Sequence, residues 1–139
     1  MPLPLSSRLV DSLLIIDGFN VLHAGILTGR DRANWWQASM QRRLVERVES
    51  CTDAAYATIW IIFDRRTNTQ SEYEDVTSND PRISIFYAPS ADDWIVTQVE
   101  ELAHKQAITV VTADRLLRER IRRAGGMLFS PMQFLATCG

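Results

Sequence analysis

The sequence has no excess of positive charge. Its 139 residues include 15 Lys and Arg against 17 Asp and Glu, which gives a net charge of -2 at pH 7 and a pI of about 5.6. A protein that binds nucleic acid through a uniformly basic surface would have the opposite balance. The composition therefore excludes a global basic field, and any contact with a phosphate backbone has to come from local patches.

Cysteines and long apolar runs are also scarce. Cys51 and Cys138 match no zinc-ligand spacing, so we expect two independent thiols in a reducing compartment. No apolar run approaches the roughly 18 residues that span a bilayer. Residues 1–11, MPLPLSSRLVD, lack the charged and apolar regions of a signal peptide. We expect residues 1–11 to be a leader, residues 12–139 to form one domain, and the protein to be cytoplasmic, without membrane contact.

Motifs of several other chemistries are missing. There is no Gly-rich dinucleotide fingerprint and no Walker A lysine. No Ser or Cys lies in a nucleophile elbow, and the segment Asp17-Gly18-Phe19 lacks the second acid of aspartyl-phosphate phosphatases. These absences disfavour dinucleotide enzymes, P-loop nucleotide hydrolases and α/β-hydrolases.

What the sequence does contain is an alternation of short apolar runs and longer amphipathic ones. Near-continuous apolar runs are typical of strands that are buried on both faces of a parallel sheet. The amphipathic segments predict helices over 34–50, 92–104 and 114–124, and a short one that starts at Ser130 and Pro131. The alternation predicts an α/β sandwich with a mostly parallel sheet of about five strands, flanked by helices. The predicted strands are LLII (13–16), TIWIIF (58–63), ISIFY (83–87), ITVVT (108–112) and, more weakly, MLFS (127–130).

Each of the first four predicted strands is followed by an acid. Because the carboxyl ends of parallel strands meet at one edge of a sheet, we expect these acids to converge there. Convergent carboxylates raise one another's pKa unless a cation compensates them, and hard oxygen ligands suit Mg²⁺ or Mn²⁺. A metal at such a site can polarise a phosphoryl oxygen, as in metal-dependent nucleases. The acids are Asp17, with Asn20 one turn later, Asp64, the pair Asp92 and Asp93, and Asp114, which follows Thr112.

Helix capping is the alternative interpretation of these acids. Asp93 and Asp114 lie where helices are predicted to begin, and an Asp cap contributes about 1 kcal/mol. Ser90 and Asp93 also have the spacing of a capping box. Asp17 is different, because it ends an apolar strand and because Gly18 permits a tight turn or the close approach of a ligand. The coincidence of four acids favours metal binding over capping alone.

Four segments together resemble a known family: LLIIDGFNVLH, IIFDRR, APSADDWIVTQVEEL and VVTADRLLRERIRRAGG. They are similar to the YacP-like branch of NYN domains, relatives of the PIN and FLAP nucleases, over residues 12–136. The resemblance implies a PIN-like three-layer fold and a Mg²⁺- or Mn²⁺-dependent endoribonuclease that hydrolyses RNA phosphodiester bonds. The chain departs from the family pattern at Arg65, where relatives often have Gly. By position, the resemblance implies catalytic roles for Asp17, Asp64, Asp92, Asp93 and Asp114, with metal ligands among Asp17, Asp92 or Asp93, and Asp114.

Arginines beside these acids are the candidate phosphate contacts. Arg65 follows one acid and Arg115 another, and Arg118 lies on the same helical face as Arg115. A solvated helix face is the alternative interpretation of that arginine row. The prediction for substrate binding covers Arg65, Arg115 and Arg118, together with Asn20 and the supporting hydroxyl of Thr112.

The aromatic residues and His23 have weaker assignments. Trp35 and Trp36 cannot both face inward on one helix, so one of them is a candidate contact for a base or a partner. His23 follows the DGFN segment, and a structural hydrogen bond is the favoured interpretation.

Two other classes of function stay open at this stage. One is a non-catalytic RNA-binding or ribosome-binding module that keeps the fold, and the other is a metal-dependent phosphatase on small substrates. The expected partner is RNA, with a ribosome context as one setting. The sequence does not choose between RNA and DNA, one or two metal ions, or a monomer and a homodimer.

Overall fold

The computed structural model describes residues 12–51, 56–65 and 74–138. The described residues form a five-stranded sheet of order β3-β2-β1-β4-β5 in which every neighbouring pair is parallel. The strands are β1 (Leu13–Asp17), β2 (Thr58–Asp64), β3 (Ile83–Ala88), β4 (Ile108–Val111) and β5 (Met127–Phe129). Each coincides with a predicted apolar run, which confirms the predicted strand set.

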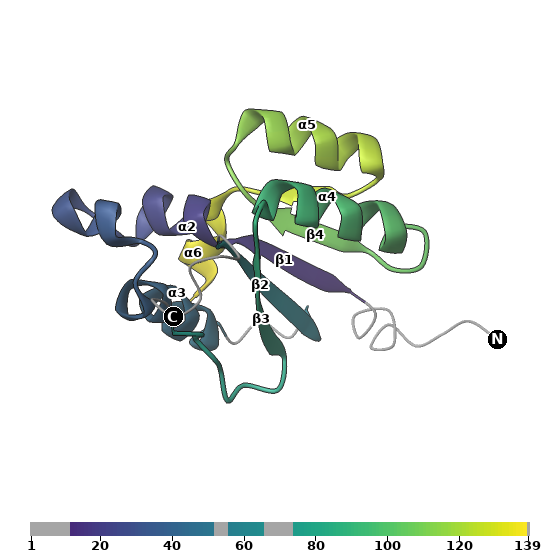
Figure 1. Ribbon diagram of the computed structural model, residues 1–139. Helices are drawn as coiled ribbons and strands as arrows, with labels where there is room; N and C mark the ends of the chain where they lie inside the picture. Colours follow the sequence, from purple (N-terminus) through teal and green to yellow (C-terminus); the bar gives the residue numbers. More distant parts are fainter. Residues whose placement is uncertain (1–11, 52–55, 66–73, 139) are drawn as a thin grey trace.

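Helices cover both faces of this sheet. In Figure 1, α4 and α5 lie on one side of the strands, whereas α2, α3 and α6 lie on the other. Strand β1 explains why both faces are covered, because Leu14 and Ile16 pack into one buried cluster and Leu13 and Ile15 into the other. The three-layer sandwich is confirmed. The helices are α2 (Gly18–Gly25), the 3-10 helix η1 (Gly29–Asn34), α3 (Ala38–Glu49), α4 (Ala91–Leu102), α5 (Arg115–Ala124) and α6 (Pro131–Thr137).

Two helical details differ from the sequence prediction. The helix predicted over 34–50 begins only at Ala38, because the 3-10 helix η1 ends at Asn34 and residues 35–37 form a turn between the two helices. Helix α2 was not predicted, since DGFN reads as a turn. Gly18 makes its direct start possible: a Cβ on Gly18 would lie 2.5 Å from ring atoms of Phe63. The close approach that Gly18 permits in this structure is therefore to β2.

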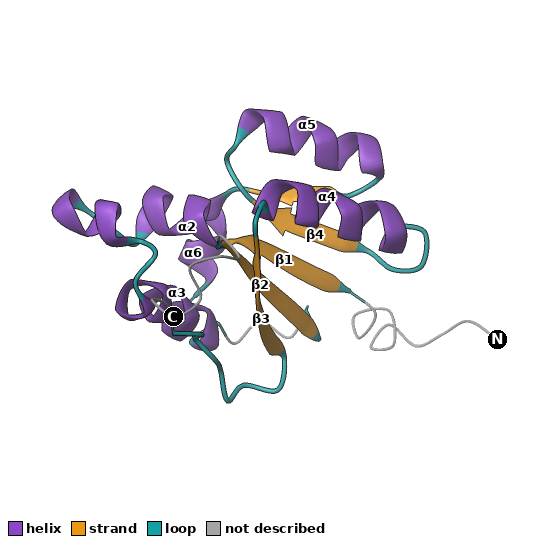
Figure 2. Cartoon of the chain, viewed as in Figure 1, coloured by secondary structure: helices purple, strands orange, loops and turns teal. Residues whose placement is uncertain are grey.

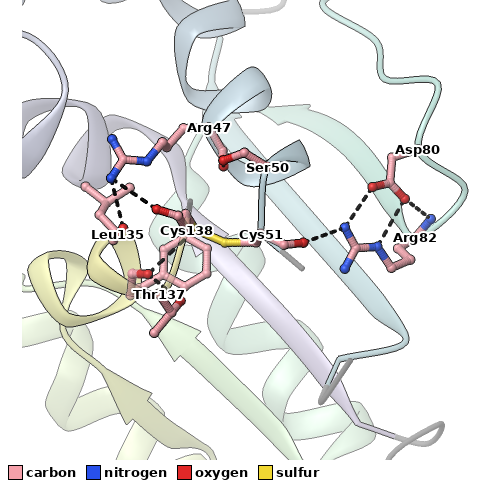
Figure 3. The surroundings of a disulfide bond; sticks show 9 residues. Arg47, Ser50, Cys51, Asp80, Arg82, Leu135, Thr137 and Cys138 are labelled. Carbon is pink, nitrogen blue, oxygen red and sulfur yellow. Dashed lines mark hydrogen bonds and ion pairs between the residues drawn. A yellow bond between two sulfur atoms is a disulfide. The ribbon is translucent and has the colours of Figure 1, made fainter. Parts of the chain in front are cut away.

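The two cysteines form a disulfide, so the prediction of two independent thiols is wrong. Cys51, directly after α3, is bonded to Cys138 at the end of α6 across 87 residues of sequence. Arg47 reinforces the junction by donating a hydrogen bond to the carbonyl oxygen of Leu135 at 2.9 Å (Figure 3). Spacing in the sequence did not show this pair, because the fold alone brings the two ends together.

Other predictions concern the division of the chain and its contact with a membrane. Residues 1–11, predicted to be a leader, lie outside the described residues, so the proposed division into a leader and one domain over 12–139 stays a prediction. Residues 66–73 also lie outside them, and residues 74–82 contain no helix or strand. Within the described ranges, no helix has the length and apolar character needed to cross a membrane.

Candidate active site

The candidate site lies where the strand order reverses. Strands β2 and β3 extend the sheet from one side of β1, and β4 and β5 extend it from the other. In parallel sheets of this kind, ligands bind beyond the carboxyl ends of the strands at this switch point. Figure 2 shows that α2 and the starts of α4 and α5 follow those ends. The predicted acids Asp17, Asp64, Asp92 and Asp114 all belong to these segments.

Asp17 is the most buried of these acids, with 4% of its surface exposed. Its Oδ2 accepts a hydrogen bond from the Thr112 hydroxyl at 2.9 Å, and its Oδ1 accepts one from the Asn20 backbone N–H at 3.5 Å. Burial raises the pKa of Asp17 to about 7; the Thr112 hydrogen bond opposes this rise, and the nearby Asp92 adds to it. Asp17 is thus a weak cap of α2 and, at the same time, a buried carboxylate that costs free energy to ionise.

Three further acids lie close enough to act on one another. Burial raises the pKa of Asp92, and repulsion from Asp114 and then Asp64 raises it further, whereas Arg120 lowers it. Asp64 also contributes to the raised pKa of Asp17. The structure therefore brings Asp17, Asp64, Asp92 and Asp114 into one electrostatic cluster, which we call the acid cluster.

Asp93 is directed away from this cluster. Its Oδ1 accepts a hydrogen bond from Arg120 at 2.9 Å, and its side chain is 70% exposed. Its backbone N–H donates to the Ser90 hydroxyl at 3.2 Å, which caps α4. Of the two adjacent acids between which the sequence does not choose, the structure places Asp92 toward the others.

Asp64 and Asp114 each use one oxygen to hold the backbone. Asp64 Oδ1 accepts a hydrogen bond from the Ala91 N–H at 2.9 Å, and Asp114 Oδ1 accepts one from the Leu117 N–H at 3.1 Å as the cap of α5. A carboxylate has two oxygens and about four acceptor positions. Capping and metal binding are therefore compatible here.

Thr112, Asn20 and Arg118 connect the elements that carry the acids. The buried Thr112 hydroxyl donates to Asp17 and accepts from the Asp114 N–H at 3.2 Å. Asn20 Oδ1 accepts from the Ala113 N–H at 2.8 Å, and Arg118 Nη1 donates to the Thr112 carbonyl oxygen at 2.9 Å. These contacts hold the start of α2 against the β4–α5 connection, so all three residues position the site. Their predicted contact with substrate stays a prediction.

The two other predicted arginines have different surroundings. Arg65 lies over the Tyr87 ring at 3.6 Å, is ion-paired with Asp75 and is only 12% exposed along its side chain. Arg115 is exposed and lines a surface pocket with Leu116, Arg118, Glu119 and Arg122. Arg115 is therefore the better placed of the two to meet a phosphate.

Sequence reasoning missed two residues at this edge. Arg120 binds Asp93, which lies 27 residues earlier in the sequence, and no local sequence pattern predicts that pair. Phe19, two residues after Asp17, is 38% exposed. The available signal was a large aromatic residue directly beside a proposed ligand.

The acid cluster has the donors that a hard divalent cation prefers. Among the described residues, no three acidic, His or Cys side chains are already close enough together to hold a metal ion. Mg²⁺, however, usually keeps several waters and takes only one or two carboxylates from the protein. The cluster meets that requirement, because Asp17 is buried and negative groups dominate the charges that act on it. The donor set therefore fits Mg²⁺ or Mn²⁺.

With this geometry in place, comparison with known proteins identifies the class. The chain matches the YacP-like NYN domain over residues 14–138 and belongs to that family, which confirms the resemblance seen in the sequence. The family consists of PIN-like domains that are typically nucleases and typically use divalent metal ions.

A solved structure supports the same fold. The crystal structure of a mutant of Rae1 (YacP) from Bacillus subtilis superimposes with a TM-score of 0.59 at 17% identity, covering 89% of this chain and 72% of that one. At this identity the likeness establishes the fold alone. No curated protein matches the sequence.

Proposed function

We propose that this protein is a metal-dependent endoribonuclease that hydrolyses RNA phosphodiester bonds at the acid cluster. Asp17, Asp92 and Asp114 would hold one or two Mg²⁺ or Mn²⁺ ions, and Asp64 would complete the acidic pocket. The ion would supply Lewis-acid chemistry, polarising the scissile phosphate and lowering the pKa of the attacking water. Membership of the family supports this proposal.

The residues around the acids orient the reacting groups. Thr112 and the Asn20 backbone N–H fix both oxygens of Asp17, so this carboxylate is held in one direction. Arg115, exposed at the start of α5, would hold the RNA backbone next to the cluster. The negative charge of the acid cluster would repel a phosphate. The bound cation and the arginine would both offset this repulsion, so both are needed.

The buried Asp17 is the single observation that carries the proposal. A carboxylate with 4% exposure is expensive to ionise, and nearby acids add to that cost. At a purely structural position of this kind, Asn would keep one acceptor oxygen and would avoid the cost of the buried charge. A bound cation would stabilise the ionised form of Asp17 and would thus offset the cost of burying its charge.

The test is a cleavage assay with three substrates. End-labelled single-stranded RNA, structured RNA and DNA are incubated with the protein in Mg²⁺, Mn²⁺ or EDTA. We expect metal-dependent endonucleolytic cleavage of RNA by the wild type and its loss in Asp17→Asn, with an unchanged circular dichroism spectrum. Wild-type cleavage by the pure variant would reject the assignment of Asp17.

The same assay covers the alternatives. A non-catalytic RNA-binding module has one observation in its favour, namely that no three potential ligands among the described residues are already gathered around one point. It would show binding without cleavage in any metal. Release of inorganic phosphate from small monoesters would indicate a phosphatase instead.

The cellular setting forms a second part of the proposal. We propose RNA as the partner, with the ribosome as one possible setting, and a cytoplasmic location. The Cys51–Cys138 disulfide bears on that location, because disulfides persist mainly in oxidising compartments. In a reducing cytoplasm the pair would be held as thiols.

A further inference from the structure

Phe19 is a large apolar side chain that stays exposed beside the acid cluster. It lies in the first turn of α2, two residues after Asp17, and 38% of its surface is accessible. Burial of such a side chain would stabilise the fold. The exposure of Phe19 forgoes part of that stabilisation at the edge of the sheet where the acids gather.

The Phe19 ring is nevertheless held in a defined position. The His23 ring lies 4.1 Å from it between centroids at an angle of 31°, and Trp35 meets it edge-on at 5.0 Å. The His23 ring nitrogens lie 3.0 Å from the carbonyl oxygens of Phe19 and Arg32, so His23 ties α2 to η1. We call Phe19, His23 and Trp35 the aromatic platform.

A second set of contacts keeps η1 beside this platform. Arg43 of α3 donates hydrogen bonds to the Asp31 carboxylate and to the Ile26 carbonyl oxygen, both at 3.2 Å. These bonds join α3, η1 and the end of α2. The platform is therefore organised before any ligand arrives, which reduces the entropy that binding would cost.

The segment that carries the platform is positively charged, unlike the whole chain and unlike the acid cluster next to it. Residues 18–43 contain four arginines and a single aspartate, whereas the full sequence has a net charge of -2. Arg30 and Arg32, both exposed in η1, lie in the segment that His23 holds against α2. Aromatic side chains among cationic ones are typical of surfaces that bind single-stranded nucleic acid, where bases stack and phosphates meet arginines.

We propose that the aromatic platform stacks an unpaired nucleobase of the RNA strand whose phosphodiester lies at the acid cluster. Phe19 would then favour single-stranded over paired RNA, because a base inside a duplex keeps its faces against its neighbours. The inference rests on the proposed function for the identity of the strand. It adds a base-binding subsite to a site so far described by its acids and arginines.

The test measures binding without catalysis. A single-stranded RNA oligomer that contains the fluorescent base 2-aminopurine is titrated with the full chain in EDTA. We expect Phe19→Leu to weaken binding by about 5- to 150-fold, the effect of losing one stacked base, and to reduce quenching of the probe. Phe19→Trp should keep both signals. Met127→Ala is the matched control, since Met127 is an exposed apolar residue at the start of β5, the opposite end of its strand from the acid edge.

An abasic scan separates stacking from a structural effect. Removing one base at a time from the oligomer should reveal one position where the wild type loses affinity and Phe19→Leu loses none. The dependence of binding on salt should stay the same in Phe19→Leu, because no charge changes. A flat scan in the wild type, or Phe19→Leu binding that equals wild type, overturns the inference.

Two further results distinguish the platform from its alternatives. If Phe19→Leu changes only the sedimentation behaviour of the protein, the platform is a protein contact and the inference falls. Base-dependent binding without Mg²⁺-dependent cleavage would keep the platform and reject the nuclease. Cleavage with a flat scan would reject the platform alone.

Discussion

At the residue scale, two adjacent aspartates of identical chemistry have opposite surroundings. Asp92 is partly buried and repelled by Asp114 and Asp64, whereas Asp93 is exposed and paired with Arg120. The helical geometry of α4 separates them, because consecutive residues on a helix point about 100° apart. They therefore form a natural matched pair of mutations.

The prediction for this pair is a large difference in cleavage rate. We expect Asp92→Asn to lower the metal-dependent rate by at least one to two orders of magnitude, because loss of a ligand or its support commonly costs 10- to 100-fold. Asp93→Asn should keep most of the rate, since an exposed ion pair contributes little. Both variants are compared under single-turnover conditions. Equal losses in the two would mean that Asp93 also turns toward the site.

The raised pKa of Asp17 predicts how the stability of the metal-free protein depends on pH. Its pKa is about 7 in the folded state and near the ordinary aspartate value of 3.8 in the unfolded chain. Between these two pH values the folded protein binds one proton more than the unfolded chain. The protonated Asp17 therefore contributes to the free energy of unfolding below pH 4, and this contribution is lost as the pH rises through 7. At 1.36 kcal/mol per pKa unit, the loss is at most about 4 kcal/mol.

Denaturant melts of wild type and Asp17→Asn in EDTA, at pH 4.5 and pH 8, check this. We expect the variant to be the more stable protein at pH 8 and to have no such advantage at pH 4.5. Saturating Mg²⁺ at a hundredfold excess over the dissociation constant should stabilise the wild type by about 2.7 kcal/mol and the variant by much less. A variant that is less stable at both pH values would show that Asp17 acts mainly as a cap.

At the element scale, α5 combines two roles along its length. Its first turn carries Arg115 into solvent beside the acid cluster, whereas Arg118, one turn on, is tied to the Thr112 carbonyl. The helix ends at Gly125, whose φ of 98° no other residue type adopts as easily. One helix thus presents a cationic side chain and also fixes the β4–α5 connection.

Substitution of these arginines should separate the two roles. Arg115→Ala is expected to lower the salt slope of single-stranded RNA binding by about 0.7, the value for one phosphate contact, with little change in stability. Arg118→Ala should lower the free energy of unfolding by about 1.5–3 kcal/mol, since it removes a hydrogen bond from a charged group. Arg123→Ala, in the last turn, is the control and should change neither. The salt slope and a urea melt are measured for each variant, and an unchanged slope in Arg115→Ala would mean a merely solvated helix face.

At the scale of the whole molecule, the disulfide links two helices of the layer formed by α2, α3 and α6, which covers one face of the sheet. It connects the end of α3 to the end of α6, and α6 in turn packs against α2, where a Cβ on Gly25 would meet the Leu135 side chain at 2.5 Å. Helix α2 carries Asn20 and begins at Asp17. The disulfide thus fixes the layer on which one side of the candidate site rests.

Reduction of this disulfide should destabilise the fold. Closing a loop of 87 residues lowers the conformational entropy of the denatured state. In the chain-entropy model this stabilises the folded state by about 4–5 kcal/mol, whereas measured effects are typically about 2–4 kcal/mol. We expect dithiothreitol, or Cys51→Ser with Cys138→Ser, to lower the melting temperature by several degrees. Dithiothreitol should have no further effect on the double variant. A melting temperature that is insensitive to reduction would mean that the packing of α6 alone holds the layer.

The strands, and the edge of the sheet at which the acids collect, could be predicted from the amino-acid sequence. Both are local properties: an apolar run of four to six residues indicates a strand that is covered on both faces, and the residues after each run lie at its carboxyl end. The sequence did not predict α2, because DGFN has the composition of a turn and only the packing of Gly18 against Phe63 shows why a helix can begin there.

The construction of the site, in contrast, depends on contacts between residues that are distant in the sequence. The burial of Asp17 and its bond to Thr112 join residues 95 positions apart, and they depend on β4 lying next to β1, an order that no local pattern contains. The same holds for Asp93 with Arg120, Arg65 over Tyr87, and Cys51 with Cys138. Residue type and spacing determine which chemistry is available, whereas the order of the strands determines which side chains meet, because that order sets the distances on which charge, burial and bonding depend.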